Sequence, residues 1–140
     1  MKLILLRHGE SQWNLENRFT GWTDVDLTKN GIDEANFAAN QLLKSNIKVS
    51  SIHTSILTRA NHTANIVAEI LKFDKNEIQN DWRLNERHYG ALQGLNKSET
   101  ASKYGEDQVK IWRRSFETPP PSLDYHDKRH PRFIKKLYTI

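Results

Sequence analysis

The stretch that decides the fold reads Met1-Lys-Leu-Ile-Leu-Leu-Arg-His-Gly-Glu10. An apolar run ends abruptly at Leu6, and the polar residues Arg7 to Glu10 follow it at once. An unbroken apolar run of this length is typical of a strand that is buried on both faces of a parallel sheet. The sequence therefore predicts a first strand over residues 1–6, with Arg7, His8, Gly9 and Glu10 just beyond its carboxyl end.

Strand-like and helical patterns alternate in the residues that follow. The expected elements are a polar loop over 12–30 that includes Asn30, a helix over 32–43, a strand over 49–53, a helix over 58–71 capped by Thr58, a strand over 78–84, and a helical region over 97–115 interrupted near Gly105. Such alternation predicts right-handed parallel units. We therefore expect an α/β protein, a three-layer α/β/α fold with a mostly parallel sheet, in a single domain over residues 1–140.

Composition excludes several classes of function. The chain has 140 residues, a net charge of +4 and no cysteine, which excludes disulfides, zinc-thiolate sites and a cysteine nucleophile. Residues 126–140 contain five basic residues and one acidic residue, so the excess charge lies in the tail. We therefore expect a loosely ordered basic tail over 122–140 and no nucleic-acid partner. No apolar run is long enough to span a bilayer and none reads as a secretory leader, so we expect no membrane partner and a cytoplasmic location.

The ends of the first two predicted strands carry the residues of a phosphate site. Ligands of open parallel sheets bind beyond the carboxyl ends of the strands, where His8, Arg7 and Arg59 would meet. A neutral imidazole is a competent nucleophile toward phosphorus, and the guanidinium groups would neutralise the transferring phosphoryl group. Neither a phosphate-binding glycine loop nor a metal-ligand cluster is present, so we expect chemistry without a metal. The Arg-His-Gly triplet alone is weak evidence, because a lone histidine at a strand end is usually an ordinary residue.

A longer pattern strengthens this interpretation. The segments that carry it are Arg7–Asn14, Asn17–Trp22, Asp24–Leu27 with Gly31, Ser55–Ala60, Trp82–Lys97 and Trp112–Phe116 followed by three prolines. In this order they resemble the histidine phosphatase superfamily and, more narrowly, the 2,3-bisphosphoglycerate-dependent phosphoglycerate mutases. The resemblance is dense over residues 1–121 and loose over 122–133.

The resemblance implies a role for each matching residue. His8 would be the phosphohistidine nucleophile and Glu86 the general acid/base, and Arg7, Asn14 and Arg59 would hold the phosphoryl group. The resemblance further implies a substrate pocket that includes Gly9, Glu10, Ser11, Gln12, Trp13, Thr20, Gly21, Arg87, His88, Tyr89, Lys97, Arg113 and Arg114. It also implies interconversion of 2-phosphoglycerate and 3-phosphoglycerate in glycolysis and gluconeogenesis. The phosphoryl primer would be 2,3-bisphosphoglycerate, the substrate a small phosphorylated carboxylic acid, and the assembly a homodimer or homotetramer.

The chain departs from the family pattern at one point. Members carry a second catalytic histidine in a late His-Gly motif, on a strand beside the first one, and no His-Gly follows His8-Gly9 here. The chain therefore resembles the N-terminal portion of a mutase, and we expect little or no mutase activity and marginal solubility. Two alternatives stay open: a histidine phosphatase of broad specificity, and an inactive fragment that binds anions or a full-length partner.

Overall fold

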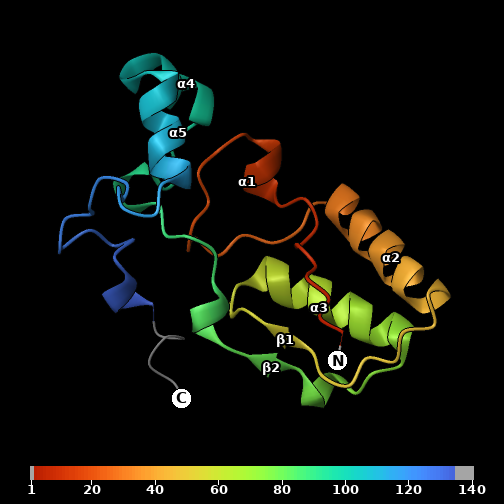
Figure 1. The fold of residues 1–140 in the computed structure, drawn as a ribbon. Helices are drawn as coiled ribbons and strands as arrows, with labels where there is room; N and C mark the ends of the chain where they lie inside the picture. Colours follow the sequence, from red (N-terminus) through yellow and green to blue (C-terminus); the bar gives the residue numbers. More distant parts are fainter. Residues whose placement is uncertain (1, 135–140) are drawn as a thin grey trace. The chain divides into compact units, whose positions relative to one another are not determined.

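The computed structural model describes residues 2–134, which divide into two compact units (Figure 1). Unit 1 comprises Met1–Gln12 and Val25–Leu84, and unit 2 comprises Trp13–Asp24 and Asn85–Ile140. None of the helices in the described part of the chain combines the length and the apolar character needed to cross a bilayer.

Two helices form the larger part of unit 1. Helix α2 spans Lys29–Lys44 and helix α3 spans Thr58–Leu71, and they pack against each other. The Thr28 side chain caps α2 by accepting a hydrogen bond from the backbone N–H of Gly31. Small side chains dominate the buried faces of both helices, so their backbones approach closely; those of α2 are Gly31, Ala35 and Ala39, and those of α3 include Thr63, Ala64 and Ala68.

A short parallel sheet completes unit 1. Strand β1 is His53–Thr54 and strand β2 is Gln79–Asn80, with His53 aligned to Gln79 and Thr54 to Asn80. Helix α3 connects them, which gives the parallel strand–helix–strand unit that the alternating pattern predicts. The 3₁₀ turns η1 (Lys75–Glu77) and η2 (Trp82–Leu84) flank β2. The predicted strands over 49–53 and 78–84 are thus shorter than expected.

Three predictions about unit 1 are wrong. Residues 2–6 form no strand, and the side chains of Leu3 and Leu5 are 80% and 86% exposed. A strand needs a hydrogen-bonded neighbour, and in the described residues this segment has none. Thr58 is the first residue of α3 and Leu57 occupies the cap position without a side-chain hydrogen bond. Asn30 lies inside α2, because Thr28 starts the helix earlier than the loop prediction assumed.

Unit 2 is built from short helices around a small apolar core. Its elements are α1 (Gln12–Leu15, which begins at the last residue of the first segment of unit 1), η3 (Gly90–Leu92), α4 (Lys97–Tyr104), α5 (Glu106–Arg114) and η4 (Pro131–Phe133). The Asn96 side chain caps α4, and Gly105 separates α4 from α5, which confirms the predicted interruption. Phe19, Leu92 and Val109 form the core.

The residues after α5 are held by turns and by contacts with the 89–93 segment. Pro121 accepts a hydrogen bond from the backbone N–H of Ala91, and Arg129 donates to the carbonyl oxygen of Gln93 at 2.7 Å. Arg129 also pairs with Asp127, and this pair lowers the pKa of Asp127 to about 2. The loosely ordered tail expected over 122–140 lies partly outside the described residues, because 135–140 are not described.

Candidate active site

The Gly9–Glu10 backbone of unit 1 lies directly against the first turns of α2. A β-carbon at Gly9 would overlap the carbonyl oxygen of Gly31, and one at Gly31 would overlap the carbonyl oxygen of Glu10. Only glycine permits this approach from both sides. The contact is reinforced because the Glu10 carbonyl accepts from the Thr28 backbone N–H at 2.9 Å and the Glu10 N–H donates to Glu34 Oε2 at 2.8 Å. The segment that follows His8 is therefore fixed by its backbone.

His8 is half-buried and has a defined tautomer. Its Nδ1 lies 2.7 Å from the carbonyl oxygen of Gly9. A carbonyl oxygen only accepts hydrogen bonds, so Nδ1 carries the proton and the lone pair of the neutral ring is on Nε2. A neutral imidazole held in this way presents Nε2 as its nucleophilic atom.

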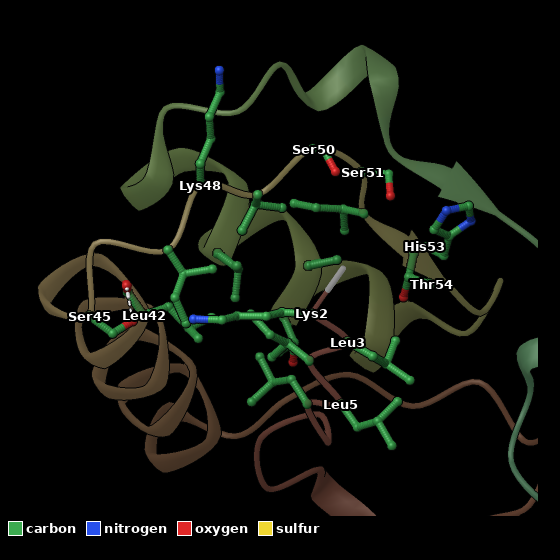
Figure 2. Close-up of a pocket in the computed structure, with 18 of the residues that line it drawn as sticks. Lys2, Leu3, Leu5, Leu42, Ser45, Lys48, Ser50, Ser51, His53 and Thr54 are labelled. Carbon is green, nitrogen blue, oxygen red and sulfur yellow. Dashed lines mark hydrogen bonds between the residues drawn. The ribbon is translucent and has the colours of Figure 1, made fainter.

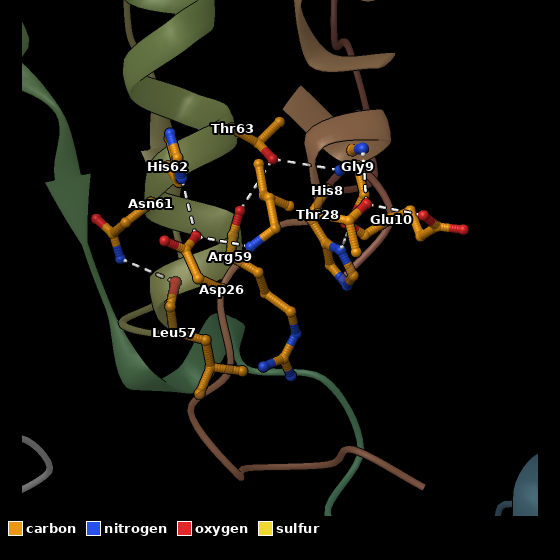
Figure 3. Close-up of polar contacts among 12 residues, drawn as sticks. His8, Gly9, Glu10, Asp26, Thr28, Leu57, Arg59, Asn61, His62 and Thr63 are labelled. Carbon is orange, nitrogen blue, oxygen red and sulfur yellow. Dashed lines mark hydrogen bonds and ion pairs between the residues drawn. The ribbon is translucent and has the colours of Figure 1, made fainter. Parts of the chain in front are cut away.

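Thr63 links the segment after His8 to the first turn of α3, which carries Arg59 (Figure 3). The Thr63 hydroxyl donates to the carbonyl oxygen of Arg59 at 2.9 Å and accepts from the Gly9 backbone N–H at 3.3 Å. The Arg59 side chain is fully buried, so its guanidinium group brings a positive charge into unit 1. The Thr63 hydroxyl thus joins the segment that follows His8 to the helix turn that carries Arg59.

The next residues of the motif are held by the 26–28 segment. Ser11 forms an antiparallel bridge with Leu27, and the Gln12 backbone N–H donates to the Asp26 carbonyl at 3.1 Å. The Asp26 carboxylate in turn lies 2.8 Å from Nδ1 of His62 on α3 (Figure 3). Arg7 is exposed at the start of the motif.

In unit 2, a buried glutamine organises the Thr20–Trp22 turn. Gly21 has a φ of +54°, and a β-carbon there would crowd the Gln93 side chain. Gln93 is 2% exposed, and its Oε1 accepts from the Trp22 backbone N–H at 2.7 Å. The turn and the 90–95 segment are also joined by backbone hydrogen bonds from Phe19 to Leu95 and from Gly94 to Phe19.

The Glu86–Tyr89 segment packs on aromatic side chains of unit 2. Trp22 Nε1 donates to the carbonyl oxygen of Glu86 at 2.7 Å, and its ring meets the His88 ring edge-on at 5.3 Å. Nδ1 of His88 accepts from the Gly90 backbone N–H at 2.9 Å. Burial lowers the pKa of His88, and the charges of His130 and Arg129 lower it further, so the neutral ring is favoured. Tyr89 stacks against Phe19 at 5.3 Å.

Unit 2 also holds donors suited to an anion. Thr20 Oγ1 and Arg87 Nε are buried and have no hydrogen-bond partner among the described residues, although Arg87 Nη2 donates to the Thr118 carbonyl. Buried donors without partners are costly, and an anion would satisfy them. Lys97 begins α4, and Arg113 and Arg114 lie in the last turn of α5. The role of these residues in holding an anionic ligand stays a prediction.

The predicted site residues divide between the two units. Those in unit 1 are Arg7, His8, Gly9, Glu10, Ser11, Gln12 and Arg59. Those in unit 2 are Trp13, Asn14, Thr20, Gly21, Glu86, Arg87, His88, Tyr89, Lys97, Arg113 and Arg114. Within residues 2–134, no three metal-ligating side chains converge on one point, and the expectation of metal-free chemistry stays a prediction.

Sequence reasoning missed two positioning residues, Thr63 and Gln93. Thr63 follows Arg59 by four residues, one helical turn, and this spacing is a signal that could have identified it. Gln93 gives no comparable signal, because its partners Trp22 and Arg129 are distant in sequence.

Comparisons with known proteins identify the family of the chain. Residues 3–137 match the profile of the histidine phosphatase superfamily (branch 1). The 2,3-bisphosphoglycerate-dependent phosphoglycerate mutase of Dichelobacter nodosus is 57% identical over 139 residues, which cover 99% of this chain and 56% of that protein. The mutase of the same name from Borreliella burgdorferi (strain ZS7) is 58% identical over 130 residues, which cover 93% of this chain and 52% of that protein. The chain spans about half the length of the curated relatives it matches.

A solved structure supports the same assignment. A mycobacterial glucosyl-3-phosphoglycerate phosphatase superposes with a TM-score of 0.68 and 28% identity, over 82% of this chain and 51% of that one. The likeness confirms the α/β fold expected from the sequence. Because the profile matches nearly the whole chain, the chain belongs to the histidine phosphatase superfamily (branch 1).

Proposed function

We propose that His8 takes up a phosphoryl group on Nε2 and that the protein interconverts 2-phosphoglycerate and 3-phosphoglycerate. The observation that carries the proposal is the 2.7 Å contact from His8 Nδ1 to the Gly9 carbonyl, which leaves the lone pair of the neutral ring on Nε2. The mutase relatives, at 57% and 58% identity, support this choice of reaction.

The first part of the reaction is the transfer of a phosphoryl group to His8. When bound, 2,3-bisphosphoglycerate supplies the phosphoryl group that primes His8. Arg7, Asn14 and Arg59 hold its oxygens, and their charge and hydrogen bonds stabilise the transition state. The hydrogen bond from Nδ1 to Gly9 stabilises the positive charge that the ring gains when Nε2 bonds to phosphorus.

The residues of unit 2 hold the rest of the substrate. A phosphoglycerate has a carboxylate and a phosphate at opposite ends, so a mutase needs cations for both. Arg87, Lys97, Arg113 and Arg114 supply the second set, and Glu86 exchanges the proton of the substrate hydroxyl. Assembly as a homodimer or homotetramer and action in the cytoplasm are part of the same proposal.

Labelling with radioactive 2,3-bisphosphoglycerate tests the first step. We expect acid-labile, base-stable label on the 140-residue chain, none on His8→Gln, and retained label on the matched control His62→Gln in the same unit. Label on His8→Gln, or none on the folded parent chain, contradicts the proposal. Turnover of 3-phosphoglycerate compared with p-nitrophenyl phosphate then distinguishes mutase from phosphatase activity.

A further inference from the structure

The 124–130 segment of unit 2, which the sequence predicts as part of a loose tail, forms turns around one ion pair. The Asp127 carboxylate accepts hydrogen bonds from Arg129 Nε at 3.0 Å, from Arg129 Nη2 at 2.6 Å and from the Arg129 backbone N–H at 2.8 Å. The Asp127 backbone N–H donates to the Asp124 carbonyl, and the His130 N–H donates to the Asp127 carbonyl. Because one carboxylate holds both the backbone and the guanidinium group of Arg129, the direction of that group is fixed within the segment.

The third nitrogen of the Arg129 guanidinium group contacts Gln93. Arg129 Nη1 donates to the carbonyl oxygen of Gln93 at 2.7 Å. The Arg129 side chain is 41% exposed, whereas Gln93 is only 2% exposed. The guanidinium group therefore attaches the 124–130 segment to a residue in the interior of unit 2.

Trp22 connects Gln93 to the predicted acid/base segment. Gln93 Oε1 accepts from the Trp22 backbone N–H at 2.7 Å, and Trp22 Nε1 donates to the Glu86 carbonyl at 2.7 Å. The Gln93 amide has little room to turn, because a β-carbon at Gly21 would lie 2.5 Å from its Oε1. A continuous chain of hydrogen-bonded residues therefore leads from Arg129 to the carbonyl of Glu86.

The 124–130 segment also affects His88, whose ring meets the Trp22 ring edge-on at 5.3 Å. Burial lowers the pKa of His88 most, and the charges of His130 and Arg129 lower it further. A positive charge disfavours an imidazolium ion when it lies close to the ring. Arg129 is therefore near both groups that contact Trp22, the Gln93 amide and the His88 ring.

We infer that Arg129 is a positioning residue for Glu86 and acts through Gln93 and Trp22. The carbonyl that Trp22 holds belongs to Glu86 itself, so its position sets the backbone from which the carboxylate side chain extends. A general acid/base must stay within hydrogen-bond reach of the proton that it exchanges. An ion pair as exposed as that of Arg129 adds little to stability, so we expect its contribution to be positional. The inference rests on the proposed role of Glu86.

Deuterium exchange of the Trp22 indole N–H tests the inference on the 140-residue chain. In Arg129→Gln this exchange should be about threefold to tenfold faster, because Gln93 loses a donor and holds Trp22 less firmly. The carboxyl carbon resonance of Glu86 should shift in the same variant. Exchange of the Val109 amide, in the core of unit 2, should stay unchanged, whereas a purely structural role of Arg129 would accelerate both.

Two further variants separate the shape of the guanidinium group from its charge. Arg129→Lys keeps the charge but lacks the planar fork that contacts a carboxylate and a carbonyl together. Its indole exchange should be as fast as in Arg129→Gln, whereas the pKa of His88 should rise only in Arg129→Gln. Lys128→Gln, the same loss of charge at the neighbouring exposed residue, should leave the indole exchange unchanged.

Equal indole exchange in Arg129→Gln and Lys128→Gln overturns the inference. So does an Arg129→Gln variant in which the Val109 amide accelerates as much as the indole, because Arg129 then supports the folding of unit 2 as a whole. Failure of the proposed function gives a different result. Unchanged turnover of 3-phosphoglycerate in Glu86→Gln would remove the acid/base role of Glu86 and would not depend on the indole exchange.

Discussion

In unit 1 the candidate site is held through contacts made by its own main chain, whereas in unit 2 it is held by the side chains of Trp22 and Gln93. The Gly9 backbone lies against Gly31 and donates to Thr63, so the main chain itself positions His8. In unit 2 the Trp22 indole fixes the Glu86 carbonyl, and the Gln93 amide fixes the Trp22 N–H. A nucleophile must be placed with high accuracy, and backbone atoms have fewer torsions through which to move than side chains have.

The units also differ in how complete their cores are. Phe19, Leu92 and Val109 in unit 2 are all nearly inaccessible to solvent. Unit 1 buries mostly small residues on α2 and α3, and it leaves Leu3 and Leu5 exposed beside an open cavity (Figure 2). Unit 1 therefore combines a candidate site held through its main chain with the less complete core.

The change with the largest expected effect is Gly31→Ala in unit 1. Helix propensity alone predicts that it stabilises α2 by about 1 kcal/mol. The overlap of a β-carbon with the Glu10 carbonyl predicts the opposite, a loss of about 3 kcal/mol or more. Denaturant unfolding measures the sign, and Asn40→Ala on the exposed face of α2 is the control. A more stable Gly31→Ala variant would show that backbone packing does not hold unit 1.

Thr63→Val should slow phosphate uptake by His8 about 10-fold to 100-fold. The substitution keeps the shape but leaves the buried Gly9 N–H without its acceptor, which costs about 1–3 kcal/mol. The rate of His8 labelling is the measurement, and Thr63→Ser should restore it. If Thr63→Val lowers stability but leaves the labelling rate unchanged, Thr63 contributes to packing and does not position His8.

Gln93→Leu tests the side-chain support of unit 2. It removes the acceptor of the Trp22 N–H, and we expect unit 2 to lose about 1–3 kcal/mol of stability. Hydrogen exchange of the α4 and α5 amides measures this, with Gln108→Leu as the same change at a half-buried position on α5. Equal effects of the two substitutions would mean that the buried amide has no special role.

The smallest expected effect is a pH dependence in unit 2. The pKa of His88 lies below its ordinary value of 6.5, so the unfolded chain takes up a proton at a higher pH than the folded chain does. The stabilising contribution of His88 is complete above pH 6.5 and is lost as the pH falls toward the lower folded pKa. His88→Asn should weaken this dependence in hydrogen exchange between pH 5 and 8. An unchanged pH profile of hydrogen exchange in His88→Asn would mean that other titrating groups cause the pH dependence of stability.

The parts of the fold that the sequence predicts correctly are those that depend on residues close together in the chain. The spacing of small and apolar residues in α2 and α3 and the break at Gly105 depend on neighbouring residues, and the sequence predicts them correctly. The apolar run at Leu3–Leu6 becomes a strand only beside a partner strand. Its pattern alone therefore predicts a strand that the described residues do not form. Among the candidate site residues, motif and position point to His8 and Arg59, and their roles stay predictions. The role of Gln93 depends on hydrogen bonds with Trp22 and Arg129, which are distant in sequence, so no local pattern predicts it.

The approach of Gly9 to Gly31 limits how the motif can be transplanted. The Arg7–Glu10 tetrapeptide does not determine its own conformation, because contacts with Thr28 at the cap of α2, with Gly31 and Glu34 on α2 and with Thr63 on α3 hold it. An excised piece that keeps all of these contacts must therefore extend at least from residue 7 through residue 63. Grafting Arg7–Glu10 alone onto another protein would transfer the histidine without the contacts that hold it in this conformation.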